Sequence, residues 1–167
     1  MKLLLGGRDH RIEGFTNIDV HNGALVDIQS DISDLSQFKD GSVDEIYASH
    51  CLEHFSHVRT VEVLKEWNRV LCSGGLIYIS VPDIDVVFNQ FKRDGLSDWV
   101  RNILWGDQEY KEAFHYTGFN FPTLADKLFQ AGFSDVKRIT KMPYGLRDCS
   151  TLVIGNNHIS VNVIGVK

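Results

Sequence analysis

Residues 2–20 read KLLLGGRDHRIEGFTNIDV, and this stretch decides the fold. Leu3 to Leu5 is a short apolar run that predicts a buried strand, which Gly6 and Gly7 then end. Asn17 to Val20 predicts a second strand, with the acid Asp19 near its end. Glycine lets a ligand approach the backbone closely, and an acid that ends the second strand can bind ribose hydroxyls. The stretch therefore predicts one side of a nucleotide-binding pocket.

The rest of the chain alternates short apolar runs with helical patterns. We expect further strands at residues 24–28, 43–49, 76–81, 136–140 and 160–166. A loop or hairpin that includes residues 151–154 is expected before the last of these strands. Strands that alternate with helices predict βαβ units, and hence an α/β domain with a mostly parallel sheet.

The clearest helical pattern spans residues 58–71. Its apolar side chains recur at spacings of three and four, which places them on one face of a helix: Val61, Leu64, Trp67 and Leu71. The glycines at 74–75 are expected to stop this helix, because glycine accepts the left-handed backbone of a helix end. Further helices are predicted at 84–105 and 122–132, the latter opened by Pro122.

Composition limits the classes of function that this chain can have. With 167 residues, it is expected to form a single domain over residues 1–167. Its 17 basic and 22 acidic residues give a net charge of −5 without a dense basic cluster, which disfavours nucleic acid as a partner. No stretch approaches the roughly 18 apolar residues that a membrane span needs. The three cysteines form no CxxC motif, which favours a reducing, cytoplasmic location.

Three further motifs make the pattern more specific. They are Ser30-Asp31-Ile32-Ser33-Asp34-Leu35, Asp40-Gly41-Ser42-Val43-Asp44 and the stretch LKEWNRVLCSGG at residues 64–75. In order and spacing, the chain resembles the class I S-adenosylmethionine-dependent methyltransferases. It is most similar to a group of small bacterial and phage predicted methyltransferases often associated with surface-sugar pathways. The resemblance covers nearly the whole chain, including His115-Tyr116 and the turn at residues 131–133.

The resemblance implies a Rossmann-like, doubly wound α/β fold. Its sheet would have seven strands, mostly parallel, with the last strand antiparallel. The implied activity is methyl transfer from S-adenosylmethionine to an oxygen or nitrogen nucleophile, on a small molecule or a saccharide. Such a transfer is a direct displacement, in which the enzyme mainly supplies proximity and alignment.

The resemblance also implies which residues hold the cofactor. Gly6, and with it Gly7, would surround its methionine part, and Asp19 would bind the ribose hydroxyls. Asp31 would meet the adenine amino group, with the Ile32 backbone nearby. Asp34 is a rival for Asp31, although its carboxylate could instead cap a short helix.

Three residues are expected close to the reacting atoms. Ser49 and His50 follow the fourth predicted strand and would lie beside the sulfonium or the acceptor. An oxygen acceptor can need a general base, and His50 and His115 are the candidates, because imidazole titrates near neutral pH.

The chain departs from the family pattern in three ways. Arg8 stands where the family has a second glycine, which adds bulk and positive charge near the expected sulfonium. The spacer from Gly6 to Phe15 is too short for a full helix. The sequence also starts directly on the first strand, with no preceding lid helix, which raises the hypothesis that a second subunit covers the pocket in a homodimer.

Three other classes of function compete with methyl transfer. The departures favour a catalytically inactive domain that kept the fold as a binding or assembly module. A nicotinamide-dependent oxidoreductase is disfavoured, since no G-x-G-x-x-G follows the first strand.

The third class is a zinc hydrolase, because residues 50–54 match the inverted zinc-protease signature H-x-x-E-H. In that interpretation His50 and His54 would bind the metal while Glu53 acts on its water. No metal is expected here, because the protease pattern needs a long helix and a downstream carboxylate ligand. Glu53 and His54 are instead expected to organise the loop at the carboxyl edge of the sheet.

Overall fold

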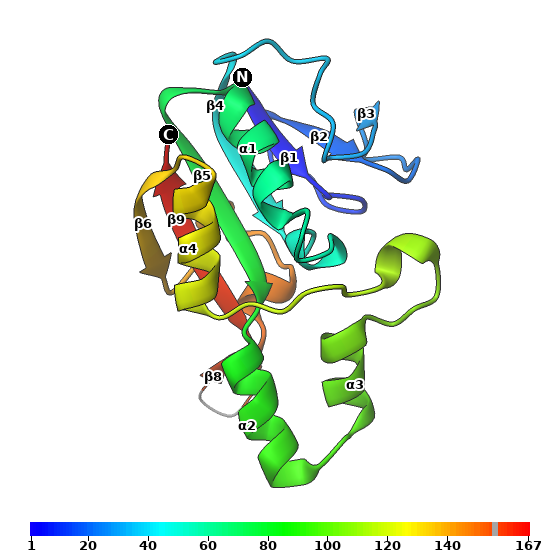
Figure 1. Cartoon of the computed structure of the whole chain (residues 1–167). Coiled ribbons are helices and arrows are strands. Elements are labelled where there is room, and N and C mark those ends of the chain that lie inside the picture. The colour runs from blue at the N-terminus through cyan, green and yellow to red at the C-terminus, as the bar shows by residue number, and fades with distance from the viewer. Residues whose placement is uncertain (155–156) are drawn as a thin grey trace.

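The computed structural model describes residues 1–154 and 157–167 and is built around a central sheet (Figure 1). Seven strands form it, in the order β3-β2-β1-β4-β5-β9-β6. Their bounds are β1 (Lys2–Leu5), β2 (Phe15–Asp19), β3 (Ile28–Gln29), β4 (Val43–Ser49), β5 (Leu71–Pro82), β6 (Ser134–Ile139) and β9 (Ser160–Val166). Strands β1 to β5 pair in parallel, whereas β9 is antiparallel to both β5 and β6. The predicted Rossmann-like α/β fold with a seven-stranded, mostly parallel sheet and an antiparallel last strand is confirmed.

The first strand is buried on both faces, as its unbroken apolar run predicts. Leu3, Leu4 and Leu5 are each at most 2% exposed, which is typical of a parallel strand with other structure over both faces of the sheet. The strand predicted at 24–28 is wrong for most of its length, because only Ile28–Gln29 pairs with β2. Residues 24–27 form a turn instead, in which the Val26 amide donates to the Gly23 carbonyl.

The helices are α1 (Thr60–Val70), α2 (Ile84–Asp94), α3 (Asp98–Trp105) and α4 (Phe121–Gln130). Short 3-10 helices are η1 (Leu52–His54), η2 (Lys111–Ala113), η3 (Pro143–Gly145) and η4 (Cys149–Thr151), and a small hairpin joins β7 (Val153–Ile154) to β8 (Asn157–His158). Helices α1 and α4 cover the same face of the sheet, while α2 and α3 extend from the end of β5 as an arm (Figure 1). The predicted helices at 58–71 and 122–132 and the hairpin near 151–154 are confirmed.

Helix α1 packs its apolar face on the sheet, with one correction to the predicted set. Trp67 is fully buried, and its indole nitrogen donates to the Ile32 carbonyl at 2.8 Å. Val63 and Val70 belong to the buried face, whereas Val61 is only partly buried. The face is therefore shifted around the helix axis from the one predicted.

The helix ends before the glycines that were expected to stop it. Leu71 already has extended angles and pairs with Val43 of β4, so the chain enters the sheet directly. The last carbonyls are satisfied from outside the helix, since the Lys167 ammonium donates to Arg69 and Leu71 carbonyls at 3.0 and 2.7 Å. Gly74 lies inside β5, and its amide donates to the Lys167 carbonyl. Tertiary pairing, rather than a glycine cap, ends α1.

The helical stretch predicted at 84–105 is divided in two. Gly95, with φ 72°, ends α2, because its amide closes on the Phe91 carbonyl in a conformation that favours glycine. Ser97 then starts α3 by accepting a hydrogen bond from the Val100 amide at 3.3 Å. The break folds α3 back beside α2, which gives the arm its hairpin shape.

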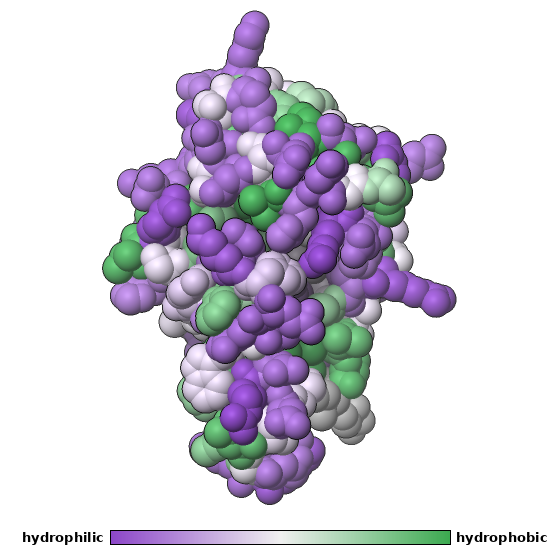
Figure 2. All heavy atoms as spheres, turned by 90° about the vertical axis from the view of Figure 1, so that its right-hand side faces the viewer, coloured by the Kyte–Doolittle hydropathy of each residue, from purple (hydrophilic) through white to green (hydrophobic). Residues whose placement is uncertain are grey.

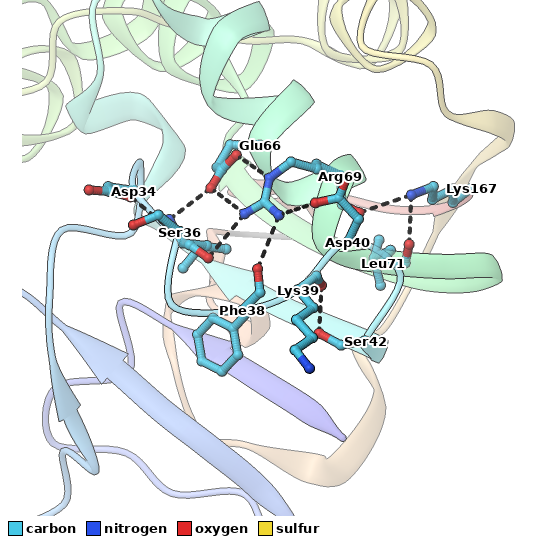
Figure 3. Close-up of polar contacts among 11 residues, drawn as sticks. Asp34, Ser36, Phe38, Lys39, Asp40, Ser42, Glu66, Arg69, Leu71 and Lys167 are labelled. Carbon is cyan, nitrogen blue, oxygen red and sulfur yellow. Dashed lines mark hydrogen bonds and ion pairs between the residues drawn. The ribbon is translucent and has the colours of Figure 1, made fainter.

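Arg69 on α1 holds the connection between β3 and β4 against the helix (Figure 3). Its guanidinium donates to the Glu66 carboxylate at 2.8 Å, to Asp40, and to the carbonyls of Leu35 and Phe38 at 3.0 Å. The Glu66 carboxylate also accepts from the Leu35 amide at 2.9 Å. These contacts fix a connection that follows directly on Asp31 and Ile32.

The opposite face of the sheet is covered by loops. Tyr47 and Leu4 pack there with Ile12, Phe15 and Met142 in a second apolar cluster. Figure 2 shows one side of the molecule, which is mostly hydrophilic with hydrophobic side chains in small groups. Within the described residues, no helix has the length and apolar character needed to cross a membrane.

Candidate functional site

A cavity of about 950 Å³ opens at the carboxyl ends of β1, β2 and β4. Strands β1 and β4 are neighbours whose connections leave in opposite directions, and ligands of doubly wound sheets bind at such a switch point. The wall is completed by residues 110–112 and 146–149 and by Tyr116. The volume lies in the range of small-molecule and cofactor sites. All six predicted cofactor residues line it: Gly6, Gly7, Asp19, Asp31, Ile32 and Ser49.

The turn after β1 depends on two glycines for different reasons. Gly6 has φ 68°, and a β-carbon there would lie 2.8 Å from Cβ of Cys51. At Gly7 a β-carbon would meet Asn17 Oδ1 at 2.3 Å and Leu4 at 2.6 Å. The close packing of β1 against β2 and the loop after β4 therefore requires both glycines.

Asp19 ends β2 at the wall of the cavity and is 5% exposed. Its Oδ2 accepts from the Arg8 amide at 3.0 Å, and its Oδ1 accepts from the His21 amide at 2.8 Å. The carboxylate thus holds the loops after β1 and β2 together. Each oxygen keeps further acceptor capacity, since a carboxylate offers about four lone-pair directions.

Asp31 and its rival Asp34 occupy different places. Asp31 lines the cavity, is exposed, and accepts from the Ser33 amide at 2.8 Å. Asp34 accepts from the Ser36 amide at 3.0 Å and is not part of the cavity wall. The Ile32 carbonyl is already engaged by Trp67, which fixes the backbone beside Asp31. Of the two acids, only Asp31 is positioned to contact a ligand in the cavity.

Arg8 connects the loop after β1 to the segment after α3. Its backbone has φ 30°, and its guanidinium donates to the Tyr110 hydroxyl at 2.7 Å while lying 5.1 Å from the centre of that ring. Tyr110 also meets the His21 ring edge-on, with centroids 4.8 Å apart. All three residues line the cavity. The Arg8 side chain, expected to add charge near a sulfonium, thus binds Tyr110, whose ring contacts the loops after β1 and β2.

Ser49 is the last residue of β4, and His50 follows it. The Ser49 hydroxyl has no hydrogen-bond partner among the described residues. His50 has φ 51°, and its Nε2 lies 2.8 Å from the Ser160 hydroxyl, which itself donates to the Cys149 carbonyl. His50 Nδ1 lies 3.3 Å from Glu53 Oε1. Both ring nitrogens therefore face protein atoms, although the side chain lines the cavity.

His115 lies behind the cavity wall instead of on it. Its Nδ1 donates to the Ile103 carbonyl at 2.8 Å, and its ring packs against His54 with centroids 4.8 Å apart. Burial lowers the pKa of His115, with the charge of Glu53 acting in the opposite direction. Burial of Glu53 alone would raise its pKa, but the three neighbouring imidazoles reverse this and lower it. His50, His54 and His115 thus surround one buried carboxylate.

Sequence analysis missed the contribution of the segments around residues 110 and 148. Tyr47 donates from its hydroxyl to Asp148 at 3.0 Å, and both residues line the cavity. Burial raises the pKa of Tyr47, so its hydroxyl stays protonated as a donor. No periodicity or motif marks Tyr110 or Asp148 in the sequence, because only the tertiary fold brings them to the strand ends.

The strand order, the antiparallel β9 between β5 and β6, and the cavity at the switch point define a Rossmann-like α/β fold with a ligand-sized cavity at its strand ends. Residues 13–79 match the family model described as a methyltransferase domain. The resemblance to class I S-adenosylmethionine-dependent methyltransferases is thereby confirmed. A search of curated proteins gave no match.

Solved structures share the fold. A S-adenosylmethionine-dependent methyltransferase from Archaeoglobus fulgidus aligns with a TM-score of 0.65 at 18% identity, over 99% of this chain and 85% of that one. The 1,6-didemethyltoxoflavin-N1-methyltransferase of Burkholderia thailandensis aligns with a TM-score of 0.60 at 18% identity, over 99% of this chain and 70% of that one. That structure was solved with 1,6-didemethyltoxoflavin and S-adenosylhomocysteine. A possible histamine N-methyltransferase from Thermotoga maritima aligns with a TM-score of 0.61 at 16% identity, over 99% of this chain and 81% of that one. At these identities the similarity shows the fold.

Proposed function

We propose that this chain transfers a methyl group from S-adenosylmethionine to an oxygen or nitrogen of a small polar molecule, with saccharides as the favoured acceptors. The observation that carries the proposal is the cavity at the ends of β1, β2 and β4. It brings together the glycine turn, Asp19 and Asp31, in the order that the family pattern requires. The match to the methyltransferase domain supports S-adenosylmethionine as the cofactor.

The residues present fit this cofactor. Asp19 and Asp31 supply two carboxylates for the ribose hydroxyls and the adenine amino group. The backbone of the Gly6 turn forms a concave surface for the methionine part, and the Ser49 hydroxyl, which has no partner among residues 1–154 and 157–167, lines the same cavity. When bound, the cofactor supplies an electrophilic methyl group on a sulfonium. The chain's task is to align the acceptor with that methyl group and to exclude water.

The acceptor side of the cavity favours a polar ligand. Arg147, Asp148, Tyr110 and Tyr116 combine charged groups with aromatic rings, a mixture that suits hydroxyl-rich molecules. Of the two predicted bases for an oxygen acceptor, His50 lines the cavity, whereas His115 lies behind its wall. The net charge of −5 continues to disfavour nucleic acid. A homodimer and a cytoplasmic location also stay predictions.

Turnover tests the proposal. The purified chain would be incubated with S-adenosylmethionine and a panel of saccharides and small oxygen and nitrogen nucleophiles, and S-adenosylhomocysteine would be measured. We expect product with at least one polar acceptor, and loss of product in Asp31→Ala but not in Asp34→Ala. Cofactor binding without turnover on any acceptor would favour the inactive assembly module.

A further inference from the structure

One cluster of metal-ligating side chains lies behind the cavity wall. A carboxylate oxygen of Glu53 and one ring nitrogen each of His54 and His115 all lie within 4.8 Å of one another. Glu53 and His54 come from η1, whereas His115 comes from the segment between η2 and α4. His54 also lines the cavity, so the cluster is adjacent to the candidate site.

The carboxylate of Glu53 is buried among three imidazoles, and no lysine or arginine of the described residues pairs with it. The residue is 1% exposed, and neither of its side-chain oxygens has a hydrogen-bond partner in the described part of the chain. His50 Nδ1, at 3.3 Å, is close enough for an ion pair but lacks the alignment of a hydrogen bond. A buried charge is costly unless it is paired or coordinates a metal. The buried carboxylate is therefore suited to coordinate a metal cation.

The two histidines are oriented as metal ligands are. His54 Nδ1 lies 3.1 Å from the Phe114 carbonyl, and His115 Nδ1 lies 2.8 Å from the Ile103 carbonyl. Because a carbonyl only accepts, each Nδ1 carries a proton, and Nε2 is the ring nitrogen left to bind a metal. Backbone carbonyls hold metal-binding histidines in this way in many proteins. One potential ligand atom from each of the three residues therefore lies in one small region.

The backbone fixes the cluster. The Glu53 carbonyl accepts from the Tyr116 amide at 2.9 Å and from the Thr117 amide at 3.3 Å. The His115 amide in turn donates to the Trp105 carbonyl at 3.1 Å. These bonds hold the segment of His115 against η1, so the three side chains are positioned by rigid backbone before any ligand binds.

We propose that Glu53, His54 and His115 bind a divalent transition-metal cation such as Zn²⁺. Two imidazoles and one carboxylate are a donor set that zinc accepts, and three protein ligands leave a position open for water or a ligand in the cavity. The site differs from the zinc-protease interpretation of the sequence, because His115 replaces His50 and Glu53 becomes a ligand. The proposal differs from the sequence-based expectation that no metal binds here. The proposal goes beyond methyl transfer and does not require it.

Zinc titration of the whole chain tests the site. Tag-free protein would be dialysed against a chelator, then against buffer, and titrated with ZnCl₂ in a calorimeter. We expect one Zn²⁺ per chain, with affinity lowered at least about tenfold in His115→Ala and in His54→Ala, since even outer-shell partners contribute that much. His57→Ala, which removes an exposed imidazole three residues after His54 in the sequence, is the matched control and should bind as the unmodified chain does.

A second variant and a second probe keep the outcome clear. Circular dichroism would show whether each variant is folded. If an alanine variant does not fold, Glu53→Gln, which keeps the shape of the side chain, would be titrated in its place. Co²⁺ added to the metal-free protein should give a visible absorption of a nitrogen-and-oxygen site that His115→Ala abolishes. Absence of stoichiometric zinc binding, or binding equally strong in folded His54 and His115 variants, would overturn the proposal. Loss of methyl transfer alone would not bear on it.

Discussion

The Arg8 guanidinium donates a hydrogen bond of 2.7 Å to the Tyr110 hydroxyl, and so joins two cavity walls far apart in the sequence. The same guanidinium lies over the Tyr110 ring, with 5.1 Å between its central carbon and the ring centre. Because Tyr110 also contacts the His21 ring, its segment lies against the loops after both β1 and β2. This contact has a direct consequence for ligand binding.

We predict that Tyr110→Ala weakens S-adenosylhomocysteine binding roughly tenfold, equivalent to about 1.4 kcal/mol. The substitution removes the ring that contacts both Arg8 and His21 and opens that side of the cavity. Tyr110→Phe is the matched control, because it loses only the hydroxyl and should cost about 0.5–1.5 kcal/mol at most. Calorimetric titration measures both effects. Unchanged or tighter binding in Tyr110→Ala would show that the Tyr110 segment does not cover the ligand.

The two neighbouring acids are predicted to differ in their effect on cofactor affinity. Asp31→Ala should weaken binding by about 1.5–3 kcal/mol, the usual contribution of a hydrogen bond to a charged group. Asp34→Ala removes the same group from a position outside the cavity and should leave the affinity unchanged. Equal losses in the two variants would refute the assignment of Asp31 to the cofactor.

Gly7 is predicted to be a packing requirement. In Gly7→Ala, the added carbon would lie 2.3 Å from Asn17 Oδ1 and 2.6 Å from Leu4, so we expect a loss of about 1–3 kcal/mol in unfolding free energy. Gly23→Ala is the control, because its added carbon meets Val26 at an ordinary 3.5 Å. Urea denaturation of the two variants gives the comparison. A Gly7 variant as stable as the Gly23 variant would contradict the packing shown here.

Acid should weaken the Arg69 cluster. The hydrogen bond from Arg69 lowers the pKa of Glu66, more strongly than burial raises it. A carboxyl whose pKa is lowered by folding stabilises the fold fully above its unfolded pKa, and this is lost as pH falls through the folded pKa. We predict that Glu66→Gln lowers the thermal midpoint at pH 7, with a deficit that shrinks below about pH 4.

Glu62→Gln is the matched control for that prediction, since Glu62 is exposed on the same helix. Its thermal midpoint should follow that of the unmodified chain at every pH. A Glu66 deficit that stays constant from neutral to acidic pH would mean that its charge does not stabilise the contact with Arg69.

Local sequence patterns determined most of the fold. The strands predicted at 43–49 and 160–166 match β4 and β9 residue for residue, because β-branched and other apolar residues dominate both stretches. The ends of the elements were less predictable. Helix α1 ends before Gly74 because Leu71 pairs with Val43, and no local pattern reveals that pairing.

The candidate site was predictable only where residues follow strands. Asp19 and Ser49 were found because strand ends meet at one edge of a parallel sheet. Tyr110 and the approach of His115 to Glu53 depend on the segment between α3 and α4, which has no periodicity. Its path is set by backbone bonds to η1, which only the tertiary structure shows.

Calorimetric titration with S-adenosylmethionine and S-adenosylhomocysteine tests the central claim most directly. We predict micromolar binding of both, with the heat strongly reduced in Asp19→Ala and unchanged in Asp34→Ala. Because Asp19 also holds the Arg8 and His21 amides, the fold of that variant would be checked by circular dichroism. No heat from the unmodified chain at millimolar ligand would contradict the claim and identify the cavity as something other than a cofactor site.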